Sequence, residues 1–110
     1  MNDRARDALA GMRDNANRAL DYASRNPDWM NDDLVTDAIS KRVEQVAEIA
    51  KYQFPRGMRS DFSQIKWDLI SGMREKLAHD YDQLDLDILK DVIDNLLPNL
   101  VSQIDLLVAE

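Results

Sequence analysis

The chain has 110 residues, of which 21 are acidic and 14 are basic, and it contains one histidine and no cysteine. This length suits a single domain spanning residues 1–110, near the lower limit for burying a core, so we expect the domain to form oligomers. The composition excludes disulfides and thiolate metal sites, and the net charge of −7 excludes broad attraction to nucleic-acid phosphates.

Hydropathy and charge also predict the cellular location of the protein. No apolar run is long enough to span a bilayer, and the N-terminal sequence MNDRARDALAG is too charged for a signal peptide. We therefore expect a soluble, cytoplasmic protein that makes no membrane contact. The acidic excess lies entirely in residues 61–110, so any contact with RNA would depend on a local group of arginines.

The first two segments have the spacing of amphipathic helices. Small apolar residues recur at helical intervals from about Asn2 to Ser24, and the pair Asn26–Pro27 predicts the turn that ends this helix. A second helix is expected to start near residues 31–33, any of which could cap it. Its apolar stripe is Val35, Ile39, Val43, Val46 and Ala50.

The third helix is expected after a loop. Pro55 and Gly57 break the second pattern and predict the longest loop, which is basic through Arg56 and Arg59. Asp61 or Ser63 then precedes the helical segment QIKWDLISGMREKLAH, residues 64–79. Its apolar stripe is Ile65, Leu69, Met73 and Leu77.

The fourth helix has a clear start and an internal break. Asp85 is a good N-cap, and Leu84 and Leu89 have the spacing of a hydrophobic staple. Pro98 lies inside the apolar pattern and should kink or break the helix. No alternating strand pattern is present, so the sequence predicts an all-α antiparallel four-helix bundle. Trp29 and Trp67 are expected in its core or at an interface.

The histidine suggests a possible site. Glu75 and His79 are four residues apart and could touch on a helix, whereas Arg74 and His79 would lie about 140° apart around it. A histidine can transfer protons near neutral pH, and an arginine can stabilise a pentacoordinate phosphate. The ribose 2′-hydroxyl would supply the nucleophile for metal-free RNA cleavage. The alternative is that His79 is an ordinary surface residue late in a charged helix.

The segment MREKLAHDY, residues 73–81, resembles the HEPN superfamily and, within it, the HepT-like ribonuclease toxins. Their signature R-x4-H-x-Y is matched by Arg74, His79 and Tyr81. Three longer segments are similar to the same family over about Ala8 to Leu107. They are LVTDAISKRVEQVAEIAK, IKWDLISGMREKLAHDY and LDLDILKDVIDNLLPNLVSQI.

The resemblance implies a homodimeric helical bundle with two arginine–histidine motifs in one cleft. It implies metal-independent RNA cleavage centred on Arg74 and His79, assisted by Glu75, with an RNA such as tRNA or mRNA as substrate. It also implies a nucleotidyltransferase antitoxin, which would use ATP and Mg²⁺ to transfer AMP to Tyr81. The toxin itself would need no metal or cofactor.

Two positions depart from the family pattern. The residue after the arginine is commonly Asn, Asp or His, whereas this chain has Glu75, which could pair with His79 or Arg74 and dampen catalysis. The usual Phe-Gly after the tyrosine is Asp82-Gln83 here, which makes the site more acidic. These departures keep open an alternative, a non-catalytic HEPN dimer that serves as an interaction or nucleotide-sensing module.

Overall fold

The computed structural model describes residues 1–79 and 83–109, and this part of the chain is nearly all helical. The α-helices are α1 (Asp3–Arg25), α2 (Asp33–Glu48), α3 (Trp67–Ser71), α4 (Met73–Leu77), α5 (Leu86–Asp91) and α6 (Leu97–Val108). Two 3-10 helices, η1 (Trp29–Asn31) and η3 (Arg56–Phe62), and two π-helical turns, η2 (Ile49–Gln53) and η4 (Val92–Leu96), lie between them.

The first two helices begin where side chains satisfy their free backbone N–H groups. The Asn2 side chain accepts a hydrogen bond from the Ala5 N–H at the start of α1. The Asp32 carboxylate does the same for Leu34 and Val35 at the start of α2. The predicted first helix and the predicted cap region of the second are therefore confirmed.

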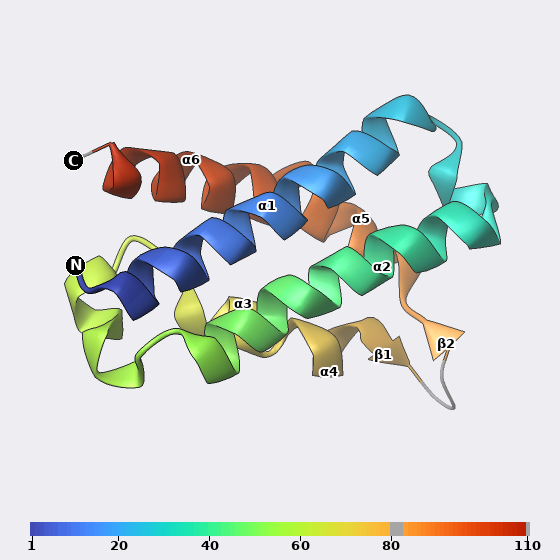
Figure 1. The fold of residues 1–110 in the computed structure, drawn as a ribbon. Helices are drawn as coiled ribbons and strands as arrows, with labels where there is room; N and C mark the ends of the chain where they lie inside the picture. Colours follow the sequence, from blue (N-terminus) through green and yellow to red (C-terminus); the bar gives the residue numbers. More distant parts are fainter. Residues whose placement is uncertain (80–82, 110) are drawn as a thin grey trace.

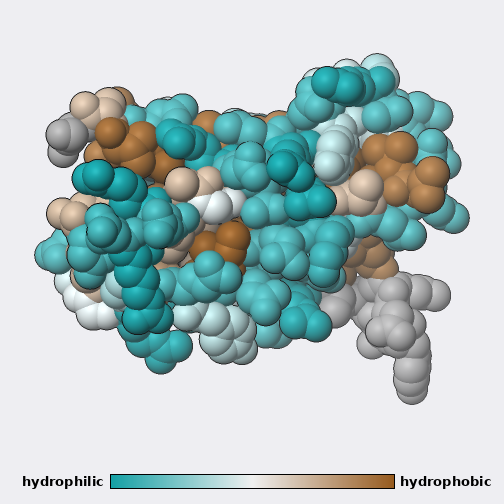
Figure 2. All heavy atoms as spheres, viewed as in Figure 1, coloured by the Kyte–Doolittle hydropathy of each residue, from teal (hydrophilic) through white to brown (hydrophobic). Residues whose placement is uncertain are grey.

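Helix α1 is the centre of the packing (Figure 1). It lies against α2 on one side and α6 on the other, while α4 packs against α2 and α5. The faces between these helices are apolar and buried, and both predicted core tryptophans, Trp29 and Trp67, are buried there. Polar side chains cover most of the face shown in Figure 2. None of the helices in the described ranges is long and apolar enough to cross a membrane.

The prediction for residues 55–79 was wrong in three respects. The expected loop contains the 3-10 helix η3, and the next helix begins at Trp67 rather than near residue 64. The backbone turns at Phe62, whose carbonyl accepts bonds from the Ile65 N–H and from the Trp67 indole. Gly72 then separates α3 from α4, which ends at Leu77.

Two short strands follow α4, although the sequence predicts none. Strands β1 (Ala78–His79) and β2 (Gln83–Leu84) are antiparallel, with Ala78 opposite Leu84 and His79 opposite Gln83. The Asp85 N–H closes this hairpin by donating to the Leu77 carbonyl at 2.9 Å. Pairs this short carry no readable alternation of polar and apolar residues, so pattern analysis does not detect them.

The last helical stretch follows the prediction more closely. Asp85 is the N-cap of α5, and its carboxylate accepts a bond from the Ile88 N–H at 3.1 Å. The predicted break at Pro98 takes the form of η4, in which the Leu97 N–H bonds to the Val92 carbonyl. Pro98 has no N–H to continue the α-helical ladder and falls in the first turn of α6, where none is needed.

Candidate functional site

Helix α4 presents Arg74 and Glu75 to solvent because its other face is buried. Met73 and Leu77 are four residues apart and both are buried against the core. Arg74 and Glu75 fall between them in sequence and are exposed. The apolar spacing that the sequence shows therefore sets the orientation of two of the four predicted site residues.

Arg74 and Glu75 line a small notch between α4 and the end of α2. The notch has a volume of about 40 Å³ and is named here the Arg74 notch. It is closed on one side by α3 and α4 and on the other by α2 and η2. Its lining residues are Ala47, Glu48, Lys51, Tyr52, Ser71, Arg74 and Glu75.

The carboxylate of Glu75 pairs with Lys51, whose Nζ lies 3.7 Å from Glu75 Oε1. The expected contact between Glu75 and His79 assumed that the helix continues through residue 79. Because α4 ends at Leu77, that four-residue spacing and the 140° separation of Arg74 from His79 do not apply. Glu75 is exposed and Lys51 is half-buried, so the pair is open to solvent and adds little stability, but it places a cation beside the glutamate.

The backbone of His79 belongs to the short strand that follows α4. The backbone of His79 lies in β1, opposite Gln83 of β2. Tyr81, the predicted AMP acceptor, lies outside the described residues. The structure therefore brings Arg74 and Glu75 into one notch and places the backbone of His79 two residues beyond the end of the same helix.

Three residues of the notch were missed by the motif analysis. Ser71 lies one turn before Arg74 and Glu75, and its Oγ is buried without a hydrogen-bond partner among the described residues. Lys51 and Tyr52 follow Ala47 and Glu48 by four positions each. That four-residue repeat, which continues the edge of α2 into η2, is the signal that could have found them.

Arg59 holds the segment that carries Lys51 and Tyr52. In the π-helical turn η2 the Phe54 N–H bonds to the Ile49 carbonyl at 3.0 Å, and Pro55 has no N–H to offer the Ala50 carbonyl. Arg59 Nη2 donates to that carbonyl at 2.7 Å. Arg59, predicted as part of a basic loop, therefore braces the end of η2.

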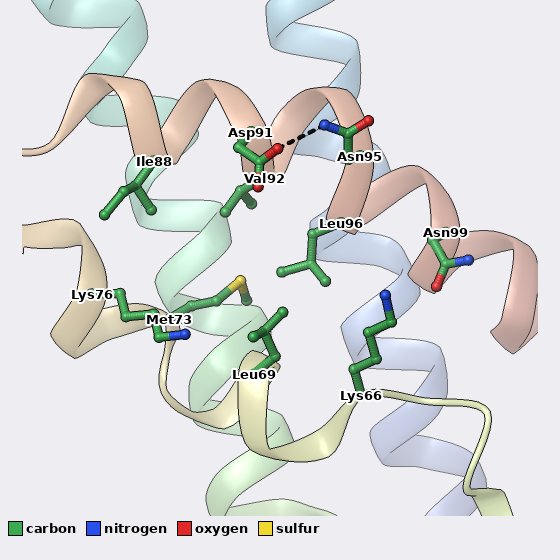
Figure 3. A pocket seen from close by; sticks show the side chains of 10 residues that line it. All are labelled: Lys66, Leu69, Met73, Lys76, Ile88, Asp91, Val92, Asn95, Leu96 and Asn99. Carbon is green, nitrogen blue, oxygen red and sulfur yellow. Dashed lines mark hydrogen bonds between the residues drawn. The ribbon is translucent and has the colours of Figure 1, made fainter.

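A separate cavity of about 380 Å³ lies between α3–α4 and α5–η4–α6 (Figure 3). Arg74 and Glu75 do not line it. Its apolar side chains point inward from both walls, and the Asp91 carboxylate accepts a bond from the Asn95 amide at 2.7 Å on its rim. The lining residues are Lys66, Leu69, Met73, Lys76, Ile88, Asp91, Val92, Asn95, Leu96 and Asn99.

Residues 1–79 and 83–109 contain no cluster of three or more histidine, aspartate or glutamate side chains that could hold a metal ion. Glu75 instead pairs with Lys51, as described above, and Glu48 is exposed on the other wall of the notch. The described part of the site thus offers two cations, two carboxylates and one buried hydroxyl. This set can bind an anionic group through Arg74 and Lys51.

Comparisons with known proteins agree on one family. The family model "Ribonuclease HepT-like" matches residues 12–107. A "Putative RNase" of Caldanaerobacter subterraneus subsp. tengcongensis is 31% identical over 77 residues, which cover 70% of this chain and 68% of that protein. A "Putative RNase" of Methanocaldococcus jannaschii is 24% identical over 78 residues, covering 71% of this chain and 64% of that protein. No solved structure matches significantly. The chain belongs to the HepT-like ribonuclease family.

Proposed function

We propose that the protein is a metal-independent RNA endonuclease that acts as the toxin of a toxin–antitoxin pair. The observation that carries this proposal is the exposed Arg74, which lines a notch on α4, the helix that leads directly into the strand of His79, in a chain of a ribonuclease family. Arg74, Glu75 and His79 are the proposed catalytic residues. RNA, such as tRNA or mRNA, is the proposed substrate.

The proposed chemistry uses the substrate's own 2′-hydroxyl as nucleophile. Its oxygen attacks the adjacent phosphorus, the bond from phosphorus to the 5′-oxygen breaks, and the products are a 2′,3′-cyclic phosphate and a 5′-hydroxyl. His79 transfers the protons, and the guanidinium of Arg74 stabilises the charge on the pentacoordinate phosphate. The ion pair of Glu75 with Lys51 supports this role for Arg74, because Lys51 offsets the carboxylate beside it.

We further propose that four helical segments form an antiparallel bundle, and that two such bundles pair as a homodimer. The four segments are α1, α2 with η2, α3 with α4, and α5 with η4 and α6. A two-fold axis near the end of α4 would bring two copies of Arg74 and His79 into one cleft. The short chain supports this, because a domain of this size gains stability by burying more apolar surface in a dimer.

The proposed regulator is a small nucleotidyltransferase antitoxin that uses ATP and Mg²⁺. The hydroxyl of Tyr81 would attack the α-phosphorus of ATP, forming an AMP–tyrosine bond and releasing pyrophosphate. The added phosphate would lie in the same motif as Arg74 and His79 and compete with the scissile phosphate for them. The toxin itself needs no cofactor in this scheme.

Growth after induced expression tests the catalytic proposal. We expect the parent to arrest growth, and Arg74→Ala and His79→Ala to lose the arrest while remaining folded by circular dichroism. Lys76→Ala is the matched control, because it removes an exposed cation from α4 without touching the Arg74 notch. Equal arrest by the parent and both variants would contradict the assignment. No arrest by the parent would favour the non-catalytic HEPN module.

The Tyr81→Phe variant tests the proposed regulation separately. Removing one hydroxyl should leave RNA cleavage intact but take away the AMP acceptor, so the variant should arrest growth even when the antitoxin is co-expressed. Intact-protein mass spectrometry should show AMP on the parent and none on the variant. Neutralisation of Tyr81→Phe together with its AMP labelling would rule out Tyr81 as the acceptor.

A further inference from the structure

Tyr52 is an exposed aromatic residue at the rim of the Arg74 notch. Tyr52 is 65% exposed. The Nζ of Lys51 lies over the ring, 5.4 Å from its centre, which is within the range of a cation–π interaction. An aromatic face next to a cation and an arginine is the combination that binds a nucleobase and its phosphate.

The backbone under Tyr52 is fixed from the core side. Phe54, two residues after Tyr52, is buried and stacks on Trp67, with ring centres 4.2 Å apart and an angle of 28° between the ring planes. Arg59 holds the Ala50 carbonyl on the other side of Tyr52 in sequence. These contacts anchor η2 at both ends, so the position from which the Tyr52 ring projects is set before any ligand binds.

The size of the notch determines which part of a nucleotide can enter it. Its volume of about 40 Å³ is a few times the roughly 10 to 15 Å³ that a cavity needs to hold one water molecule. A phosphate oxygen fits such a space, and a nucleobase does not. The Arg74 guanidinium lines the notch, where it can donate hydrogen bonds to that oxygen.

We propose that Tyr52 is the base platform of the RNA site. A phosphate oxygen of single-stranded RNA enters the notch at Arg74, and the neighbouring unpaired base stacks on the Tyr52 ring outside it. This inference rests on the proposed function, since it names the part of the substrate that the same site binds. It predicts a preference for unpaired nucleotides, because a base inside a duplex has no free face for stacking.

Binding of uncleavable RNA tests the platform without relying on catalysis. The probe is a 2′-O-methyl RNA pentamer with 2-aminopurine placed at each position in turn, bound to the full-length protein. We expect Tyr52→Leu to weaken binding about fivefold to a hundredfold and Tyr52→Phe to bind within about twofold of the parent. One probe position should show quenched fluorescence with the parent and Tyr52→Phe only. Leu34→Ala, which alters an exposed apolar residue of α2 outside the notch, should bind like the parent.

An abasic pentamer separates stacking from other effects of the substitution. When the base at the quenched position is missing, the parent and Tyr52→Leu should bind equally, because the lost interaction is the base itself. A difference that persists with the abasic probe would overturn the platform, as would equal binding of the intact probe by both proteins. Light scattering provides a further check. If Tyr52→Leu forms a smaller assembly than the parent, the ring belongs to an interface between copies and the platform proposal is overturned.

Cleavage assays on the same variants distinguish the two proposals. If the parent binds the probe through Tyr52 but cuts no RNA, the proposed nuclease function fails and the platform stands. If the parent cuts RNA and Tyr52→Leu cuts with unchanged kcat/KM and binds the probe normally, the platform fails and the nuclease stands. Both proposals are supported if the parent binds the probe and cuts RNA, and if Tyr52→Leu cuts RNA with a higher KM than the parent.

Discussion

At the scale of single residues, the structure separates two arginines that look equivalent in the sequence. Arg56 is exposed on η3. Arg59, three residues later, is half-buried, donates to the Ala50 carbonyl and lies with its guanidinium carbon 5.6 Å from the centre of the Trp67 ring. Arg59 therefore stabilises the fold, whereas the side chain of Arg56 is exposed to solvent.

Replacing Arg59 by methionine should lower the free energy of unfolding by about 2 to 3 kcal/mol. The variant keeps the apolar stem but leaves the Ala50 carbonyl without its charged donor. Urea denaturation followed by circular dichroism measures the effect. Arg56→Met is the matched control and should change stability by less than about 0.5 kcal/mol. Equal stability of the two variants would show that Arg59 does not brace η2.

At the scale of elements, the start of α5 controls the hairpin that carries His79. The Asp85 carboxylate caps α5 through the Ile88 N–H, while the Asp85 backbone N–H bonds to the carbonyl of Leu77, the last residue of α4. One residue thus ties the end of α4 to the start of α5. The hairpin between them is held from its base by this connection.

The Asp85→Ala substitution should cost about 0.5 to 2 kcal/mol of unfolding free energy, because it removes the N-cap but keeps the backbone bond to Leu77. Chemical denaturation provides the measurement. Asp87→Ala, which changes an exposed acidic residue in the first turn of the same helix, should cost only about 0.3 to 1 kcal/mol. A larger loss from Asp87→Ala than from Asp85→Ala would contradict the assignment of Asp85 as the cap.

At the scale of the whole molecule, the fold is thin. Its principal extents are 41 × 29 × 18 Å, so the shortest dimension leaves room for about two layers of helices. In so thin a body most helices have one face at the surface, and exposed apolar side chains remain on α2, α3 and α6 at Leu34, Leu69 and Leu106. This shape is consistent with the proposed homodimer, in which a partner copy covers part of that surface.

Light scattering of the purified protein should therefore give twice the mass of one chain across a dilution series. The physical reason is that a second copy buries apolar surface that a small, thin domain cannot bury alone. Arg74→Ala should keep the same mass, because it removes a charge from the cleft and little apolar surface. A mass equal to one chain at all concentrations would contradict a cleft built from two copies.

The local elements could be predicted from the sequence because neighbouring residues determine them. The first helix, the cap at Asp85 and the break before Pro98 each follow from residues within one or two turns. The buried stripe of α2 and the burial of Trp29 and Trp67 follow from apolar spacing and side-chain size. Arg74 and Glu75 could be chosen as site candidates from their motif alone.

Only the tertiary structure decided how the site is assembled. The helix that was expected to reach His79 ends at Leu77, because the chain reverses there and the Asp85 N–H takes the Leu77 carbonyl. Glu75 pairs with Lys51, 24 positions away, and Ser71 meets Tyr52, 19 positions away, in one notch. Helical spacing relates residues up to a few turns apart, whereas these contacts depend on how α3 and α4 pack against α2 and η2.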